Sequence, residues 1–308
     1  MKAVLLTGHG GLEMLRYGDA PDPTAGTGEV VVDIHAASVN AADYKVRRGG
    51  GAYGNIAFPH ILGRDFSGVV SAVGGEVSDF AVGDAVFGVT EQGVEGAYAE
   101  KIAIKAAIIA RKPDRLGHAE AAAMALTSLT ALWAIEDTAR LKSGETILIQ
   151  GGAGGVAGFG IQLAKHVGAT VITTASAGNH SYVRGLGADR VIDYKVEDFA
   201  TAVSNCDVVF DTVGGDVRAG CYRVLRPGGR LVWIAPAPEG FRPLRSDVET
   251  LRPNVIRDRA HLERMLALLD AGAVRPPTIV RYKLADASEA HRVSESRHLQ
   301  GKLIFAVR

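Results

Sequence analysis

Short apolar runs separated by turn residues characterise the first 120 residues of the chain. Two of these runs, Val30–His35 and Ser67–Val73, are rich in valine, and glycine, proline and aspartate residues interrupt the sequence around them. Such runs are typical of strands joined by turns. The pattern predicts a β-rich domain over residues 1–120.

The pattern changes between residues 121 and 255, where strand-like runs alternate with helical ones. The predicted elements, in chain order, are a helical run at Ala119–Thr138, a strand at Thr146–Gln150, a helix ending near Val167, a strand at Thr170–Thr174, a helix at Asn179–Leu186, strands at Arg190–Asp193 and Asp207–Asp211, a helix ending near Leu225 and a strand at Arg230–Ala235. Strands that alternate with helices form parallel sheets with right-handed crossovers. The sequence therefore predicts an α/β fold with a doubly wound sheet over residues 121–255.

The last segment, residues 256–308, has a different pattern. Apolar residues at helical spacing predict a helix at Arg259–Ala271, which Gly272 ends. The closing segment Gly301–Val307 has the pattern of a strand. It has no evident place in the parallel sheet, so we expect it to return to the first domain.

Composition limits the kinds of partner. The 308 residues are 47% hydrophobic, and 34 Lys and Arg residues balance 34 Asp and Glu residues. A neutral balance gives no electrostatic reason to bind nucleic acid or an anionic membrane. The first apolar run is too short for a signal sequence, and no uncharged apolar stretch reaches the roughly 18 residues of a membrane span. We expect a cytoplasmic protein.

The two cysteines, Cys206 and Cys221, lie in the C-terminal half of the chain. Two cysteines are too few for a secreted disulfide framework or for a zinc site with four thiolates. We interpret both as buried thiols.

A glycine-rich loop follows the predicted strand Thr146–Gln150 and opens a helix. Its sequence over residues 151–158 is Gly-Gly-Ala-Gly-Gly-Val-Ala-Gly. Small residues allow a backbone to approach a pyrophosphate, and a helix N-terminus offers free N–H groups and a positive dipole end. We predict that Gly152, Gly154, Gly155 and Val156 bind a dinucleotide. The alternative is a tight turn without a ligand, and Ala157 replaces the usual third glycine.

Further motifs agree in order with one family over nearly the whole chain. They are SVNAADYK at Ser38–Lys45 followed by Arg48-Gly49, PHILGRDFSGVVSAVG at Pro59–Gly74, VGDAVFG at Val82–Gly88, GAYAE at Gly96–Glu100, DTVGG at Asp211–Gly215, RPGGRLV at Arg226–Val232 and GKLIFAV at Gly301–Val307. With the glycine-rich loop, the chain resembles the quinone oxidoreductases of the medium-chain dehydrogenase/reductase superfamily.

This resemblance implies a GroES-like catalytic domain, formed by residues 1–120 and 256–308. A Rossmann domain, residues 121–255, is inserted between these two parts. The resemblance also implies an active site in the cleft between the domains and a dimeric or tetrameric assembly. For a homodimer we expect the sheet edge to lie around Arg245–Leu251.

Zinc-dependent relatives carry a Cys or His near the position of Asn40–Asp43 and a GHE motif. This sequence has Gly63-Arg64-Asp65 in place of that motif, and no cysteine precedes Cys206. A catalytic zinc needs about three protein ligands. We therefore predict no metal, and a polarised acceptor such as a quinone or an α,β-unsaturated carbonyl as the substrate.

Three residues are candidates for contact with the substrate. By the resemblance, the Asn40 amide lies near the nicotinamide, although an asparagine here also suits the cap of a local turn. Tyr44 suits either a hydrogen bond to the substrate carbonyl or a packed position. Tyr53, in the glycine-rich segment 49–54, suits either a rim over the substrate or the open surface. For Arg64 we favour an ion pair with Asp65 or a neighbour over an anion-binding role.

Further candidates concern the cofactor. The resemblance places Thr130, Thr212 and Val213 near it. The second strand of the doubly wound domain ends at Ala175-Ser176 without the acidic residue that binds the ribose hydroxyls of NAD. Ser176, and Tyr194 by resemblance, suit the 2′-phosphate of NADPH, although Ser176 also suits a helix cap.

These observations predict an NADPH-dependent, zinc-independent reductase that transfers hydride to a quinone or an enone, with a proton from Tyr44 or from water. Two alternatives stay open. One is an enoyl-thioester reductase, and the other is an NADPH-binding regulatory protein with little turnover.

Overall fold

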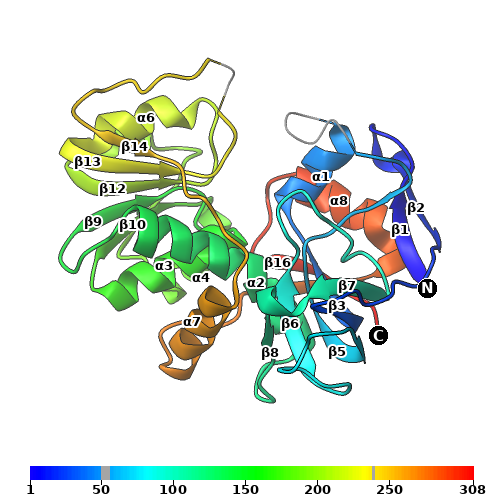
Figure 1. Cartoon of the computed structure of the whole chain (residues 1–308). Coiled ribbons are helices and arrows are strands. Elements are labelled where there is room, and N and C mark those ends of the chain that lie inside the picture. Colours follow the sequence, from blue (N-terminus) through cyan, green and yellow to red (C-terminus); the bar gives the residue numbers. More distant parts are fainter. Residues whose placement is uncertain (50–55, 238–239) are drawn as a thin grey trace. The chain divides into compact units, whose positions relative to one another are not determined.

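The computed structural model describes residues 1–49, 56–237 and 240–308. The chain separates into two compact units (Figure 1). The first comprises residues 1–126, 257–266 and 276–308, and the second comprises residues 127–256 and 267–275.

Most strand pairs of the first unit are antiparallel. A three-stranded sheet has the order β2-β1-β4, and a seven-stranded sheet has the order β15-β16-β3-β5-β6-β8, with β7 also paired to β3. Their bounds are β1 Lys2–Leu6, β2 Leu15–Asp19, β3 Glu29–Val39, β4 His60–Ile61, β5 Asp65–Val73, β6 Ala85–Val89, β7 Lys101–Lys105, β8 Ile109–Arg111, β15 Ile279–Lys283 and β16 Lys302–Ala306. This is the β-rich, GroES-like domain that the sequence predicts.

Helix α1, Ala41–Arg48, begins directly after β3. The carboxylate of Asp43 accepts a hydrogen bond from the backbone N–H of Asn40 at 2.8 Å, and this contact satisfies one of the free donors at the helix start. The helix ends at Gly49, whose φ of 77° is in the left-handed region that favours glycine. Helix α8, Ala287–Glu295, packs against α1. The sequence patterns did not predict α8.

The second unit contains a parallel sheet of six strands in the order β11-β10-β9-β12-β13-β14. The strand bounds are β9 Thr146–Ile149, β10 Thr170–Thr174, β11 Arg190–Ile192, β12 Cys206–Asp211, β13 Leu225–Trp233 and β14 Glu249–Leu251. The predicted doubly wound sheet is confirmed. Strand β14 is an edge of this sheet and lies within the segment that we expected there.

Helices connect the parallel strands. Figure 1 shows α3 beside β9 and β10, and α6 beside β12 and β13. Helix α4 contacts β11. The bounds are α2 His118–Leu132, continued by a π-helix at Trp133–Thr138, α3 Gly155–Val167, α4 His180–Gly185, α5 Phe199–Ala202, α6 Val217–Val224 and α7 Arg259–Asp270. The short helix α5 was not predicted.

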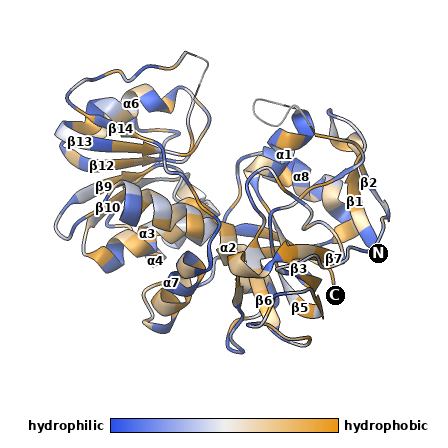
Figure 2. Cartoon of the chain, in the orientation of Figure 1, coloured by the Kyte–Doolittle hydropathy of each residue, from blue (hydrophilic) through white to orange (hydrophobic). Residues whose placement is uncertain are grey.

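The expected return of the last strand to the first domain is confirmed. Strand β16 pairs antiparallel with β3, with Phe305 opposite Ala37, and parallel with β15. Residues from both ends of the chain therefore share one sheet and one hydrophobic core, in which Ile34, Phe66 and Phe305 are fully buried. Figure 2 shows hydrophobic residues along β3 and β5 of this sheet.

Both cysteines are buried free thiols, as expected. Burial raises the pKa of the Cys206 thiol to about 12, so this group stays protonated at neutral pH. None of the helices in the described part of the chain has the length and apolar character that a membrane crossing requires.

Candidate active site

The glycine-rich loop is held by its own backbone against strand β10. Gly151 has a φ of 71°, and its N–H donates to Thr174 Oγ1 at 3.0 Å. The N–H of Gly152 donates to the carbonyl oxygen of Thr174, also at 3.0 Å. Thr174 Oγ1 in turn donates to Gln150 Oε1 at 2.7 Å. These contacts fix the turn between β9 and α3.

Gly152 fills a position in which no side chain fits. A Cβ atom there would lie 2.3 Å from Thr173 Oγ1 and 3.1 Å from Ile161 Cδ1. Gly154 precedes α3 in an extended conformation, and Gly155 and Val156 form its first turn. The first N–H groups of a helix have no intrahelical acceptor, so this close-packed turn presents free donors to an anion. Ala157 is buried in the same turn.

Ser176 lies two residues after the end of β10. Its side chain makes no capping hydrogen bond, so the alternative role as a helix cap is not observed. Its Oγ instead accepts a hydrogen bond from Asn179 Nδ2 at 3.3 Å. Tyr194 follows β11 and is about half exposed. The end of β10 carries no carboxylate, in agreement with its sequence.

A second loop follows β12 and contains Thr212 and Val213. Thr212 Oγ1 donates to the carbonyl oxygen of Gln150 at 2.7 Å, which ties this loop to the end of β9. The Asp211 carboxylate accepts from the N–H groups of Val213 at 3.0 Å and Gly214 at 2.7 Å. The loop therefore has a defined shape at the same sheet edge as the glycine-rich turn.

The buried guanidinium of Arg218 holds that second loop. Its Nε donates to Asp211 Oδ2 at 3.1 Å, and one terminal nitrogen donates to the carbonyl oxygen of Ala235 at 2.9 Å. The same guanidinium lies over the Trp233 ring, with 4.7 Å between Cζ and the ring centroid. Because Asp211 is also fully buried, the ion pair compensates two charges removed from water.

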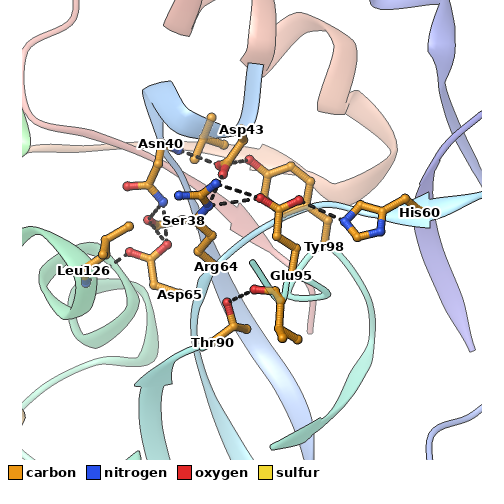
Figure 3. A network of polar contacts seen from close by, with 12 residues as sticks. Ser38, Asn40, Asp43, His60, Arg64, Asp65, Thr90, Glu95, Tyr98 and Leu126 are labelled. Atoms are coloured by element: carbon orange, nitrogen blue, oxygen red, sulfur yellow. Dashed lines mark hydrogen bonds and ion pairs between the residues drawn. The ribbon is translucent and has the colours of Figure 1, made fainter. Parts of the chain in front are cut away.

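In the first unit, polar side chains gather around the junction of β3 and α1 (Figure 3). Asn40 Nδ2 donates to Asp65 Oδ1 at 2.7 Å, and Ser38 Oγ donates to the same oxygen at 2.7 Å. The other oxygen of Asp65 accepts the backbone N–H of Leu126 at 3.4 Å. Both oxygens of this buried carboxylate are therefore occupied.

Lys302 of β16 reaches the same place from the other end of the chain. Its Nζ donates to Asn40 Oδ1 at 2.7 Å and to the carbonyl oxygen of Val39 at 2.9 Å. Burial lowers the pKa of this lysine, whereas the charges of Asp65 and Asp43 oppose the shift. The Asn40 amide thus lies between an ammonium group and a carboxylate.

Asp43 is fully buried on the other side of Asn40. Its Oδ2 accepts the Tyr98 hydroxyl at 2.7 Å, and its Oδ1 lies 3.7 Å from Arg64 Nε. Burial raises the pKa of Asp43 to about 7, Arg64 opposes this shift, and Glu95 adds to it. Burial together with the Asp43 charge raises the pKa of the Tyr98 hydroxyl well above its ordinary value.

Arg64 forms an ion pair as expected, and its main partner is Glu95 rather than the adjacent Asp65. Both Nε and a terminal nitrogen donate to Glu95 Oε1, at 3.0 and 2.9 Å. Asp65 instead binds Asn40 and Ser38, because alternate residues of an extended chain point to opposite faces. His60 Nε2 lies 3.0 Å from the second oxygen of Glu95 and completes this group.

The remaining predicted residues lie as follows. Tyr44 is buried on α1, and the Arg48 guanidinium lies over its ring, with 5.7 Å between Cζ and the ring centroid. Thr130 is buried in α2, in the second unit. Tyr53 lies outside the described residues.

The sequence patterns missed Lys302, Glu95 and Tyr98 as members of the polar network. Two of them stand inside quoted motifs, Tyr98 in GAYAE and Lys302 in GKLIFAV. The signal that could have identified them is a polar residue at a strand or turn position that is expected to be buried, because a buried polar group needs a hydrogen-bond partner.

Comparisons with known proteins agree with this architecture. Residues 26–114 match the family model described as alcohol dehydrogenase GroES-like domain, and residues 186–305 match the model described as zinc-binding dehydrogenase. The chain is 33% identical to the chloroplastic NADPH-dependent alkenal/one oxidoreductase of Arabidopsis thaliana, over 99% of this chain and 79% of that protein.

Two further relatives match over their full length. The chain is 31% identical to a quinone oxidoreductase of Pseudomonas aeruginosa, over 99% of each protein. Among solved structures, the Escherichia coli quinone oxidoreductase complexed with NADPH is similar with a TM-score of 0.91 and 27% identity, and the match covers 100% of both chains.

Proposed function

Because the chain belongs to the quinone oxidoreductase family of the medium-chain dehydrogenases/reductases, and is an NAD(P)H-dependent oxidoreductase of that type, we propose that its cofactor is NADPH and that it reduces quinones or α,β-unsaturated carbonyls without zinc. The observation that carries the proposal is the turn at Gly152, where a close-packed backbone presents free N–H groups at the carboxyl edge of a parallel sheet.

The cofactor end of the proposal concerns the 2′-phosphate. Gly152 and Gly154 let the backbone approach the pyrophosphate closely, and the N–H groups of Gly155 and Val156 in the first turn of α3 bind it. At the end of β10, a carboxylate would repel a phosphate, and Ser176 stands there instead. The exposed Tyr194 side chain after β11 supplies a second contact. NADPH is accordingly preferred over NADH.

The substrate end concerns Asn40, Tyr44 and Tyr53. NADPH supplies a hydride when it is bound. Thr130, Thr212, Val213 and Asn40 hold the nicotinamide ring, and proximity together with orientation lowers the barrier for the transfer. The proton comes from Tyr44 or from water. The side-chain N–H of Asn40 stabilises the negative charge that develops on the acceptor oxygen.

Zinc does not fit the residues around Asn40. Both oxygens of Asp65 accept hydrogen bonds, and Asn40 Oδ1 accepts the Lys302 ammonium. A divalent cation would have to share this space with a buried ammonium group, which the Coulomb repulsion opposes. Over residues 1–49, 56–237 and 240–308, no three His, Cys, Asp or Glu side chains gather in the geometry of a metal site.

Turnover assays test the function directly. We expect NADPH oxidation with 9,10-phenanthrenequinone, and a higher kcat/KM for NADPH than for NADH with the same quinone. Equal values would refute the cofactor preference. Crotonyl-CoA in parallel identifies an enoyl-thioester reductase, and no turnover with either acceptor would favour a regulatory NADPH-binding protein.

The assembly is a homodimer in this proposal. Within the described part of the chain, strand β14 has a neighbour on one side only, and unpaired strand edges favour pairing with a second copy. Light scattering at micromolar concentration is expected to give twice the mass of the chain. The mass of one chain would contradict the dimer.

A further inference from the structure

The side-chain amide of an asparagine has a carbonyl oxygen on one side and an NH2 group on the other. These two groups have nearly the same shape, so partners and not sterics decide which one faces a ligand. Asn40 has a charged partner at each end, because Lys302 Nζ lies 2.7 Å from Oδ1 and Asp65 Oδ1 lies 2.7 Å from Nδ2. A rotated amide would place NH2 against an ammonium and C=O against a carboxylate.

From this arrangement we propose that Lys302 is a positioning residue, which fixes the Asn40 amide with its N–H group available to the reacting ligand. The inference rests on the proposed function, since Asn40 is the residue expected beside the nicotinamide and the substrate. Lys302 itself touches neither of them in this proposal. It acts through Asn40.

The surroundings of Lys302 support a fixed rather than a mobile ammonium. The residue is 4% exposed, and a second hydrogen bond joins Nζ to the carbonyl oxygen of Val39 at 2.9 Å. Val39 and Asn40 are consecutive, so one ammonium holds both the end of β3 and the side chain that follows it. Lys302 is also the first residue of β16, and the pairing of β16 with β3 fixes its position.

The Asn40 amide retains capacity for a ligand. One Nδ2 hydrogen is used by Asp65, and among the described residues the only other acceptor of Nδ2 is Ser38 Oγ, at a long 3.4 Å. Asn40 is also partly exposed, whereas Ser38, Asp65 and Lys302 are buried. Hydrogen bonds in a chain polarise one another, so the ammonium on Oδ1 makes the remaining N–H a stronger donor.

A purely structural role for Lys302 makes a different prediction. In that case its charge only neutralises the buried carboxylates Asp65 and Asp43, and its removal would destabilise the unit whatever residue stands at position 40. The two roles differ in whether the removal of Lys302 still lowers kcat/KM when the Asn40 amide is absent.

The first experiment is a double-mutant cycle in the full-length protein with NADPH and 9,10-phenanthrenequinone. We expect Lys302→Met to lower kcat/KM by about 10-fold or more, the effect of losing a charge-assisted hydrogen bond. In the Asn40→Ala background the same change should cost less than about 2-fold. Equal losses in both backgrounds would overturn the inference.

The matched control is Lys112→Met. The Lys112 ammonium likewise donates to backbone carbonyl oxygens, those of Leu116 at 2.8 Å and Pro113 at 3.1 Å, and it lies outside the network around Asn40. Lys112→Met should change kcat/KM by the same factor in the wild-type background and in the Asn40→Ala background. If Lys302→Met does not fold, Asp65→Asn removes the negative charge at the other end of the amide and must show the same dependence on Asn40.

A second readout needs no turnover. The NH2 protons of Asn40 give a pair of side-chain amide signals in a 1H–15N spectrum, identified by their loss in Asn40→Ala. We expect Lys302→Met to shift this pair and Lys112→Met to leave it unchanged. An unchanged pair in Lys302→Met would overturn the inference. If the wild-type protein shows no quinone turnover, the proposed function fails, and the spectrum still tests the positioning.

Discussion

The two regions that carry candidate site residues, one in each unit, are built in different ways. In the second unit, the turn at Gly152 is held by hydrogen bonds to Thr174 and offers backbone groups to a ligand, and its fit depends on the absence of a side chain at Gly152. In the first unit, the junction at Asn40 is made by charged side chains that Asp65, Lys302 and Asp43 contribute. Backbone N–H donors in a fixed turn suit an anion whose shape does not change. A network of charged side chains suits a place where charge develops during a reaction.

If the turn depends on the absence of a side chain, the largest effect should follow from adding one methyl group. Gly152→Ala places a Cβ 2.3 Å from Thr173 Oγ1, so the turn must shift. We expect NADPH affinity to fall about 100-fold, measured by fluorescence titration, because displacements near 1 Å have effects of that size.

The matched control for that change is Gly75→Ala, where the nearest atom, Thr27 Oγ1, is 3.9 Å away. The double variant Gly152→Ala with Thr173→Ala should regain much of the affinity, because it removes the clashing hydroxyl. Unchanged binding in Gly152→Ala would show that the loop tolerates a side chain and would end the contrast between the two regions.

The same contrast explains what the sequence predicts. The glycine-rich turn lies within eight consecutive residues, and its chemistry belongs to the backbone, so its role can be inferred from one segment. The partners in the other region are 262 residues apart for Asn40 and Lys302, and 55 apart for Asp43 and Tyr98. Only the pairing of β16 with β3 brings the first pair together.

The parallel, doubly wound sheet and the return of the last strand were predictable because hydrophobic periodicity and short connections constrain them. The partner of Arg64 was not, since Glu95 lies in a loop whose path depends on tertiary packing. The roles of Tyr44 and Thr130 stay predictions, because no periodicity specifies what a hydroxyl contacts.

The second largest effect should appear in the charged region, as a dependence of stability on pH. The pKa of Asp43 is raised by burial from the ordinary 3.8 to about 7. The folded protein therefore keeps a proton that the unfolded chain loses, so this group's contribution falls as pH rises from about 4 to about 7 and is constant above.

Asp43→Asn removes that dependence. We expect its free energy of unfolding, relative to wild type, to increase by about 2 kcal/mol between pH 5 and pH 8, as measured by urea titration. Asp114→Asn, at an exposed turn, provides the matched control. Parallel stability curves for wild type and Asp43→Asn would show that the carboxylate is ionised throughout.

A smaller effect should follow from placing a carboxylate after the end of β10, in the unit that contains the glycine-rich turn. Ser176→Asp is expected to lower kcat/KM for NADPH about 10-fold and to leave the value for NADH nearly unchanged, since only NADPH carries the 2′-phosphate. Ser204→Asp adds the same charge at an exposed loop of the same unit. Equal losses with both cofactors would place Ser176 away from the phosphate.

The last prediction is that removal of metal ions has no effect, and it concerns the polar network around Asn40. The Lys302 ammonium lies 2.7 Å from Asn40 Oδ1, so a cation already stands near the carboxylates of Asp65 and Asp43. Dialysis against a chelator should therefore leave quinone turnover unchanged. About one zinc per chain by elemental analysis, lost together with activity, would contradict this account.

The pairing of β16 with β3 also has a consequence for the order of events during synthesis. All six strands of the parallel sheet lie between Thr146 and Leu251, so that sheet can form while the chain is still being made. The sheet of the first unit contains β3, made early, and β16, made last. Until the ribosome has released β16, β3 can pair with β5 and β7 only, and Asn40 lacks its ammonium partner. We therefore expect the glycine-rich turn of the second unit to form before the network around Asn40 is complete.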